Sequence, residues 1–392
     1  MDMTEKESEK KFFSKVSLNM VTNITRVAVM ALVGFLMVPY YIDQFGLATY
    51  AILPLATSIT TYVLLASDSL AESFTRFLIL AIHKDDRDEI TRTYSTAVIG
   101  MVRLFLILLP ISIIISLLSP YLFNIGDDSH FEVQMMFFLI LVASLLVSSS
   151  SCLDSVYMAH NYLYRLYSIR IVHCLAQVAF IILFFIWFGP SLTLLGLSYL
   201  LAAVLLILWL IIGVKRIDPE INVNHRVFDK RLLKEMYDLG IWGVVIRLGY
   251  ILFIQTSQIV VNICLGSEIQ GEFSIAVNVI SMISTTCTAL VAVGVPLLYV
   301  HYNNKDRNML IKTLGLFTKF VGLILAFPIA YLFIFAPQVL TAWLGTTYND
   351  LVTMLMIMMP ICVVKCSMDI LPSVAIMYKN VKNIAIGTIG FG

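Results

Sequence analysis

The sequence predicts an all-α, polytopic membrane protein whose helices form two lobes. Of its 392 residues, 59% are hydrophobic and 13% are charged, and the mean hydropathy is +0.91. A soluble globular domain carries about 25% charged residues, so the composition indicates a chain dominated by transmembrane helices. The apolar stretches and the placement of Lys and Arg support the same class.

Ten stretches are long and apolar enough to cross a membrane, since a helix needs about 20 mostly apolar residues to span the hydrocarbon core. An eleventh is expected to begin at Asn383 and to be cut short at Gly392, which gives about 10 or 11 spans. The ten stretches lie, to within a few residues, at 16–42, 48–82, 92–118, 131–158, 166–188, 191–214, 237–265, 271–299, 309–336 and 350–378.

The 26 Lys and Arg residues predict the orientation. Twenty lie in the N-terminal tail or in every second connection, and six lie inside spans. Because cytoplasmic loops are rich in Lys and Arg, we expect a multi-pass protein of the cell (plasma or inner) membrane with a cytoplasmic N-terminus. No removable signal peptide is expected. The opposite connections, without Lys or Arg, are 43–47, 119–130, 189–190, 266–270 and 337–349.

The longest connection divides the chain. We expect an N-lobe of six transmembrane helices at 1–215, a cytoplasmic inter-lobe loop at 216–236, and a C-lobe of four spans plus a truncated fifth at 237–392. Each lobe has an arginine in its first span, Arg26 and Arg247, and an aromatic residue in the following turn. This similarity between the lobes suggests a duplicated unit. Many transporters consist of parallel repeats with a substrate path between them.

The second half of the inter-lobe loop has an apolar helical face. Two interpretations stay open: a helix on the inner membrane surface, or a solvated lead into the seventh span. The residues on this face are Phe228, Leu232, Leu233 and Met236.

Ionisable residues inside the spans are functional candidates, because each costs about 3 kcal/mol by insertion scales. At 1.5 Å per residue, Arg26 and Arg103 lie about 16 Å, and Arg247 about 20 Å, from the nearest tail or loop cation. The remaining cations are Arg76, Lys319 and Lys365, and the acids are Asp68, Glu72, Asp154 and Asp369.

Helical spacing predicts two ion pairs among them, Glu72 with Arg76 and Lys365 with Asp369, since each pair is four residues apart. The charges left over show a cationic surplus, and such an interior attracts an anion. Snorkelling into water or interhelix ion pairing stay open as structural explanations. The charges left over are Arg26, Arg103, Arg247 and Lys319 against Asp68 and Asp154.

Patterns for other chemistry are missing from the sequence. It has no glycine loop before Lys-Ser/Thr and no His-Glu-x-x-His pattern. All six cysteines lie in or beside spans, where they are expected to pack as small apolar residues. We therefore expect no enzyme, no cofactor, no metal site and no nucleic-acid partner.

Four segments carry a resemblance to a known family. They are 43–58 after the first span, 69–78 in the second, 232–242 before the seventh and 271–276 in the eighth. They are similar to segments of the oligosaccharide-lipid flippases, or polysaccharide biosynthesis export proteins, of the multidrug/oligosaccharidyl-lipid/polysaccharide exporter superfamily.

The resemblance implies an all-α, two-lobed transporter bundle of six plus six helices, with the last spans missing from this chain. It implies transport of a polyprenyl-pyrophosphate-linked oligosaccharide from the cytoplasmic to the outer leaflet by alternating access, for cell-surface polysaccharide synthesis. The implied partners are the lipid-linked glycan, membrane lipids, a coupling Na⁺ or H⁺, and glycan-assembly enzymes.

The charge surplus and the resemblance together give candidate site residues in a cationic lumen. No catalytic residue is expected. The substrate-binding candidates are Arg26, Arg103, Arg247, Lys319 and Lys365. The ion-coupling candidates are Asp68, Glu72 and Asp154.

Two alternatives stay open. A multidrug or metabolite cation antiporter of the same fold would prefer an acidic lumen, which the surplus of Arg and Lys opposes. A polytopic glycan polymerase or ligase generally needs a sizeable outer loop, and every predicted outer connection is short.

Cysteine labelling tests the predicted topology. With a cysteine at Asp127, Asp128 or Thr346, we expect labelling from outside, and with one at Lys84, Lys230 or Lys305 from the cytoplasm, because Lys and Arg are retained inside. Labelling of Asp128→Cys from the cytoplasm alone would contradict the topology and the depths counted from it.

Overall fold

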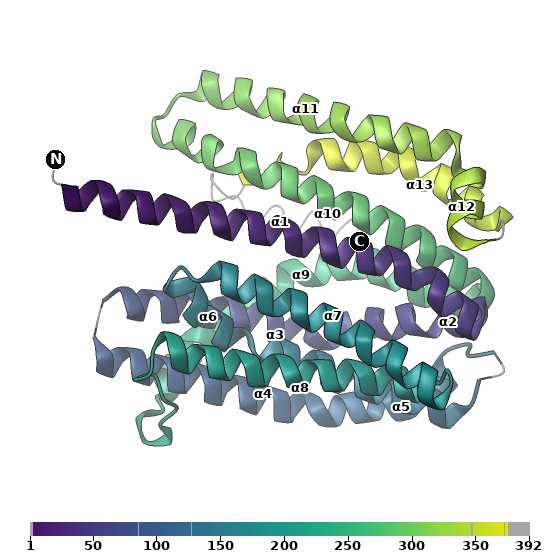
Figure 1. Cartoon of the computed structure of the whole chain (residues 1–392), viewed down its shortest axis with the longest axis horizontal. Coiled ribbons are helices and arrows are strands. Elements are labelled where there is room, and N and C mark those ends of the chain that lie inside the picture. The colour runs from purple at the N-terminus through teal and green to yellow at the C-terminus, as the bar shows by residue number, and fades with distance from the viewer. Residues whose placement is uncertain (1–2, 85, 127, 346–347, 372, 375–392) are drawn as a thin grey trace. The chain divides into compact units, whose positions relative to one another are not determined.

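The computed structural model describes residues 3–84, 86–126, 128–345, 348–371 and 373–374, and all regular elements in them are helices (Figure 1). The predicted all-α class is confirmed. The eleventh span expected from Asn383 lies outside the described residues.

The helices follow one another with short connections. They are α1 (Met3–Phe45), α2 (Leu47–Tyr50), α3 (Ile52–His83), α4 (Arg87–Leu122), α5 (His130–Ser149), α6 (Ser151–Ala159), α7 (Leu163–Phe188), α8 (Leu192–Ile217), the 3-10 helix η1 (His225–Val227), α9 (Lys230–Leu265), α10 (Ser267–Asn303), α11 (Arg307–Ile334), α12 (Ala336–Leu344) and α13 (Asn349–Met368).

Among the described residues, eight helical segments are long and apolar enough to cross a membrane. They coincide with the first six and the last two of the ten predicted spans. α9 and α10 occupy the two predicted spans between them.

The chain separates into two compact units. Unit 1 comprises Met1–Tyr40 and Leu55–Ile251, and unit 2 comprises Tyr41–Pro54 and Leu252–Gly392. These limits differ from the predicted lobes, whose boundaries stay a prediction.

In unit 1, α5 packs against both α4 and α8, and α7 also packs against α8 (Figure 1). Close approach of α5 and α8 depends on Gly196, where a Cβ would lie 3.1 Å from the Met136 Cα. α5 ends within the run Ser148–Ser151, and the Ser150 hydroxyl donates to the Val147 carbonyl over 2.7 Å. Serine hydroxyls compete with the helical backbone for such carbonyls, so the regular helix is interrupted at Ser150 and α6 begins at the next residue.

The first turns of α9, with Phe228 just before them, pack inside unit 1. Leu233 is 7% exposed and Met236 is fully buried, in a cluster with Phe74 and Met101. This apolar face is covered by α3 and α4, so neither of the two interpretations left open by the sequence describes it. Asp229 caps α9, and the hydrogen bond from the Leu232 N–H, reinforced by that from Arg231, holds the pKa of Asp229 below its usual value.

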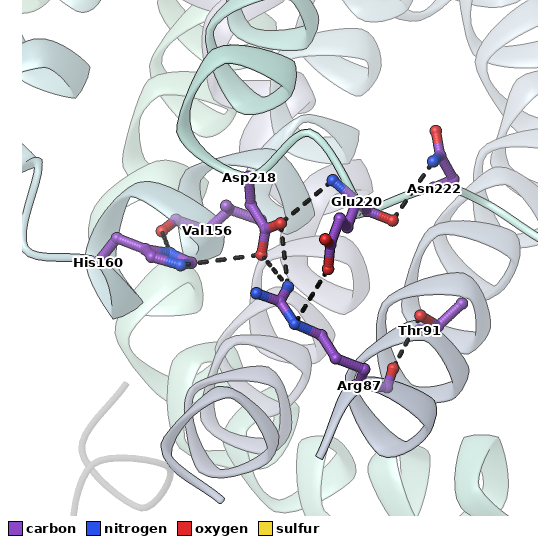
Figure 2. A network of polar contacts seen from close by, with 7 residues as sticks. All are labelled: Arg87, Thr91, Val156, His160, Asp218, Glu220 and Asn222. Carbon is purple, nitrogen blue, oxygen red and sulfur yellow. Dashed lines mark hydrogen bonds and ion pairs between the residues drawn. The ribbon is translucent and has the colours of Figure 1, made fainter. Parts of the chain in front are cut away.

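A polar cluster, named the Asp218 cluster, joins the ends of three helices in unit 1 (Figure 2). Asp218 follows α8, its side chain is 6% exposed, and it accepts from Nη1 of Arg87 at 3.0 and 2.9 Å. Arg87 Nε lies 3.3 Å from Glu220, and His160 Nε2 lies 3.9 Å from Asp218. Because Arg87 begins α4 and His160 follows α6, the cluster fixes these ends against the end of α8.

In unit 2, α10, α11 and α13 pack against one another pairwise (Figure 1). α2 packs on α10, where a Cβ on Gly271 would lie 2.8 Å from the Leu47 carbonyl oxygen. Beside this contact, a buried amide and hydroxyl cluster joins α9 to α10: Ser274 donates to Gln258 over 2.7 Å, and Gln270 donates to Gln258 over 3.1 Å.

The contact of α6 with α8 gives a stability test. A Cβ on Gly213 would lie 1.8 Å from the hydroxyl oxygen of the buried Tyr157, so we expect Gly213→Ala to lower the free energy of unfolding by about 1–3 kcal/mol. Tyr157→Phe in the same chain should recover part of this loss, because the nearest atom is removed. Thermal unfolding in detergent measures both, with Gly315→Ala, at a site with open space around it, as control. An unchanged midpoint for Gly213→Ala would contradict the packing.

Candidate functional site

Arg26 on α1 is a half-buried cation within an apolar helix. Its Nε and Nη2 donate to Asn23 Oδ1 at 3.2 and 2.9 Å, and its guanidinium carbon lies 5.2 Å from the centre of the Tyr167 ring on α7. In the described part of the chain, no carboxylate lies within ion-pair distance of Arg26. An aromatic face attracts a cation without neutralising it, so the positive charge stays available.

Asn19 fixes the same face of α1 against the start of α7. It is 8% exposed, its Nδ2 donates to Asn161 Oδ1 over 2.7 Å, and its Oδ1 accepts from the Tyr164 N–H over 2.8 Å. Asn161 has a positive φ of 55°, a conformation that asparagine tolerates better than most residues. These two bonds position α1 for the contact of Arg26 with Tyr167.

Arg103 on α4 lies with its guanidinium carbon 4.3 Å from the centre of the Phe228 ring. Its side chain is exposed, and no carboxylate among the described residues lies within ion-pair distance. Phe228 belongs to the segment anchored on α3 and α4, so the packing of that segment also places this cation.

Arg247 on α9 forms an ion pair with Glu72 on α3. The predicted pair of Glu72 with Arg76 is therefore wrong. The two helices meet closely at Gly240, where a Cβ would lie 2.6 Å from Leu70 Cδ2, and this approach brings Arg247 within reach of Glu72. Arg76 is left without a carboxylate partner within the described residues.

Asp154 on α6 forms an ion pair with Arg170 on α7. Arg170 lies inside α7 and within the apolar segment Leu163–Phe188. Oδ1 of Asp154 is buried without a hydrogen-bond partner. Because its charge is matched by Arg170, Asp154 is a weaker candidate for ion coupling than the sequence suggested.

Asp68 on α3 accepts from the Ser148 hydroxyl over 2.7 Å, and Ser148 Oγ lies 2.8 Å from Ser67 Oγ. No cation of the described chain pairs with it. Of the three ion-coupling candidates, only Asp68 has a carboxylate that contacts hydroxyl groups and has no cation partner in the described residues.

The two candidates in unit 2, Lys319 on α11 and Lys365 on α13, have exposed side chains. The predicted pair of Lys365 with Asp369 does not form in the described residues. Instead, Asp369 accepts from the Thr288 hydroxyl on α10 over 3.2 Å. The six remaining candidates all belong to unit 1.

Among the described charges inside the spans of unit 1, cations without a carboxylate partner outnumber acids without a cation partner. Two cations are neutralised by Glu72 and Asp154. Arg26, Arg76 and Arg103 then stand against Asp68 in the described residues. The ion pairs inside the spans of unit 1 therefore have different partners from those expected, and the cationic lumen stays a prediction.

The pairing of Arg247 with Glu72 predicts an energetic coupling. Arg247→Met should destabilise the protein, and adding Glu72→Gln should recover the loss, with a coupling of about 0.5–1 kcal/mol because both side chains are partly exposed. Thermal unfolding of the four proteins in the cycle measures it. The matched control is the cycle of Glu72 with Arg76, which should show no coupling. Coupling to Arg76 and none to Arg247 would contradict the pairing.

Comparisons with known proteins agree with this helical architecture. Residues 16–302 match the family model described as polysaccharide biosynthesis protein. A membrane protein of Bacillus subtilis (strain 168), the uncharacterized EpsK, is 23% identical over 346 residues, which are 88% of this chain and 68% of that protein.

Solved structures of a multidrug resistance MATE family transporter of the MOP superfamily share the fold. Its inward-facing conformation matches with a TM-score of 0.76 and 14% identity, over 93% of this chain and 87% of that chain. The outward-facing conformation matches with a TM-score of 0.66 and 15% identity, over 96% and 84%. With most of its length matched by the family model, the chain belongs to the polysaccharide biosynthesis protein family, and it shares the helical fold of these MATE transporters.

Proposed function

We propose that this protein moves a polyprenyl-pyrophosphate-linked oligosaccharide from the cytoplasmic to the outer leaflet of the cell membrane by alternating access. Membership of the polysaccharide biosynthesis protein family and a fold shared with transporters support this role. The observation that carries the choice of an anionic head group is Arg26, a cation within an apolar helix that has no carboxylate partner in the described chain.

Arg26 is suited to a phosphate by its chemistry. A guanidinium presents parallel N–H donors that match two phosphate oxygens, and charge-assisted hydrogen bonds of this kind are stronger than neutral ones. Asn23 and Tyr167 restrict the side chain, which lowers the entropy lost on binding. Asn23 accepts from Nε and from one N–H of Nη2. The edge formed by Nη1 and the second N–H of Nη2 remains for the substrate, apart from a weak contact of Nη1 with the Met30 sulfur.

The remaining elements of the mechanism follow from the same charges. The N-terminus lies in the cytoplasm, by the asymmetry of Lys and Arg. Asp68 is the candidate for a coupling Na⁺ or H⁺, since its carboxylate has hydroxyl neighbours in Ser67 and Ser148. Arg103 and Arg76 add to the positive field that an anionic head group meets in unit 1.

A second candidate, a multidrug or metabolite cation antiporter, is favoured by the likeness to multidrug transporters of the MATE family. That likeness is one of fold. A cationic substrate in unit 1 would face three cations without carboxylate partners in the described residues, and like charges in a medium of low dielectric repel strongly. The charge distribution therefore favours the anionic substrate.

Complementation of an export-deficient strain tests the proposal. We expect Arg26→Ala to lower export by about tenfold to a hundredfold, since a hydrogen bond to a charged group contributes about 1.5–3 kcal/mol, with protein abundance unchanged. Arg26→Lys should restore part of the export, because Lys keeps the charge but loses the forked donors.

Arg231→Ala, at a side chain that is 90% exposed, is the control and should export normally. Full export by Arg26→Ala at normal abundance would refute the role of Arg26. Transport of organic cations in place of lipid-linked glycan would support the antiporter.

A further inference from the structure

Unit 1 contains a cavity of about 380 Å³, within the range of about 300–1,000 Å³ that is usual for ligand pockets. α4, the junction of α5 and α6, and α8 form its walls, and residues 221–223 close one end. Most of the lining is apolar and includes Val98, Met101, Phe105, Leu146, Leu153 and Ile207. An apolar cavity of this kind suits a hydrocarbon chain.

The cavity is open at its side. Val102 on α4 and Ile211 on α8 line it and are 51% and 39% exposed. Both helices are among those long and apolar enough to cross a membrane, so the opening between these residues faces the depth at which lipid chains lie. A ligand can therefore enter from the bilayer.

One end of the cavity is polar. Lys215, in the last turn of α8, lines this end with Asn222, and no carboxylate of the described chain pairs with Lys215. Tyr94 also lines the cavity and is 5% exposed. A cation without a carboxylate partner in the described residues, beside a hydrocarbon-sized cavity, points to a ligand with an anionic head group.

The Asp218 cluster holds this polar end in place (Figure 2). Arg87 fixes Asp218, only three residues before Ile221, and Asn222 is held on α4 because its carbonyl accepts from the Ser95 hydroxyl over 3.4 Å. Residues 221–223 thus form a fixed wall beside Lys215.

We propose that this cavity binds one acyl chain of an acidic phospholipid, with the lipid phosphate at Lys215. The length supports this occupant. The distance along the α4 axis from Tyr94 to Phe105 is about 16 Å. This is close to the thickness of one leaflet, which is half of a hydrocarbon core about 30 Å thick. The predicted topology puts Lys215 at the cytoplasmic surface, where anionic lipids attract basic side chains.

This lipid site is separate from the proposed transport site. Neither Arg26 nor Arg103 lines the cavity, and a resident lipid at α8 does not require that the protein export a glycan.

Native mass spectrometry of the full chain, delipidated in detergent and titrated with phosphatidylglycerol or with phosphatidylcholine of the same acyl chains, tests the proposal. We expect one phosphatidylglycerol to bind about fivefold more tightly than phosphatidylcholine. This is the gain in affinity that corresponds to the attraction of about 1 kcal/mol between one Lys and an anionic head group. Lys215→Gln should abolish this preference. Arg216→Gln, at the exposed neighbour that does not line the cavity, should keep it.

A second pair of variants tests whether the lipid acyl chain lies in the cavity. Ile211→Trp, which fills the opening, should remove the bound lipid, whereas Ile212→Trp, 51% exposed on the same helix and outside the cavity, should retain it. Elution as one species in gel filtration checks folding of each variant. The proposal would be overturned by equal affinity for the two lipids, or by an equal loss of the phosphatidylglycerol preference in Lys215→Gln and Arg216→Gln. It would also be overturned if Ile211→Trp kept the bound phospholipid, or if the cavity held a polyprenyl lipid in place of the phospholipid.

Discussion

The cost of an unpaired charge in a medium of low dielectric constrains the whole structure. A cation in an apolar helix must meet a carboxylate, an aromatic face, water or a ligand. Two arginines inside the spans of unit 1 meet carboxylates, Arg170 at Asp154 and Arg247 at Glu72. Arg26 meets the Tyr167 ring and an amide oxygen, neither of which neutralises it. The difference between these environments separates structural cations from the candidate for substrate binding.

Small and polar residues place these cations. Gly240 lets α9 approach α3, which makes the ion pair of Arg247 with Glu72 possible. Asn19 ties α1 to the start of α7 and so sets Arg26 against Tyr167. At the end of the same unit, Asp218 joins α4, α6 and α8 and fixes the wall beside the lipid cavity. A few buried polar contacts between helices thus organise both proposed sites, whereas the apolar contacts supply most of the packing.

The spans and the surplus of positive charge could be predicted from the sequence, because hydropathy and spacing are properties of single segments. The ion pairs could not. Spacing reports only neighbours on the same helix, so it paired Glu72 with Arg76, whereas the partner Arg247 comes from another helix. Tyr167 and Phe228 carry no signal of spacing or charge that would reveal them as partners of Arg26 and Arg103. The apolar face of 228–236 was recognised, but what covers it depends on tertiary packing.

The central claim is that Arg26 recognises the charged head group of a lipid substrate. Its most direct test is the affinity of the purified protein for a polyprenyl pyrophosphate and for the matching neutral polyprenol, measured with and without the Arg26→Ala substitution. The account predicts that the unsubstituted protein prefers the pyrophosphate, and that Arg26→Ala loses this preference while keeping its affinity for the polyprenol. An equal preference in both proteins would contradict the claim.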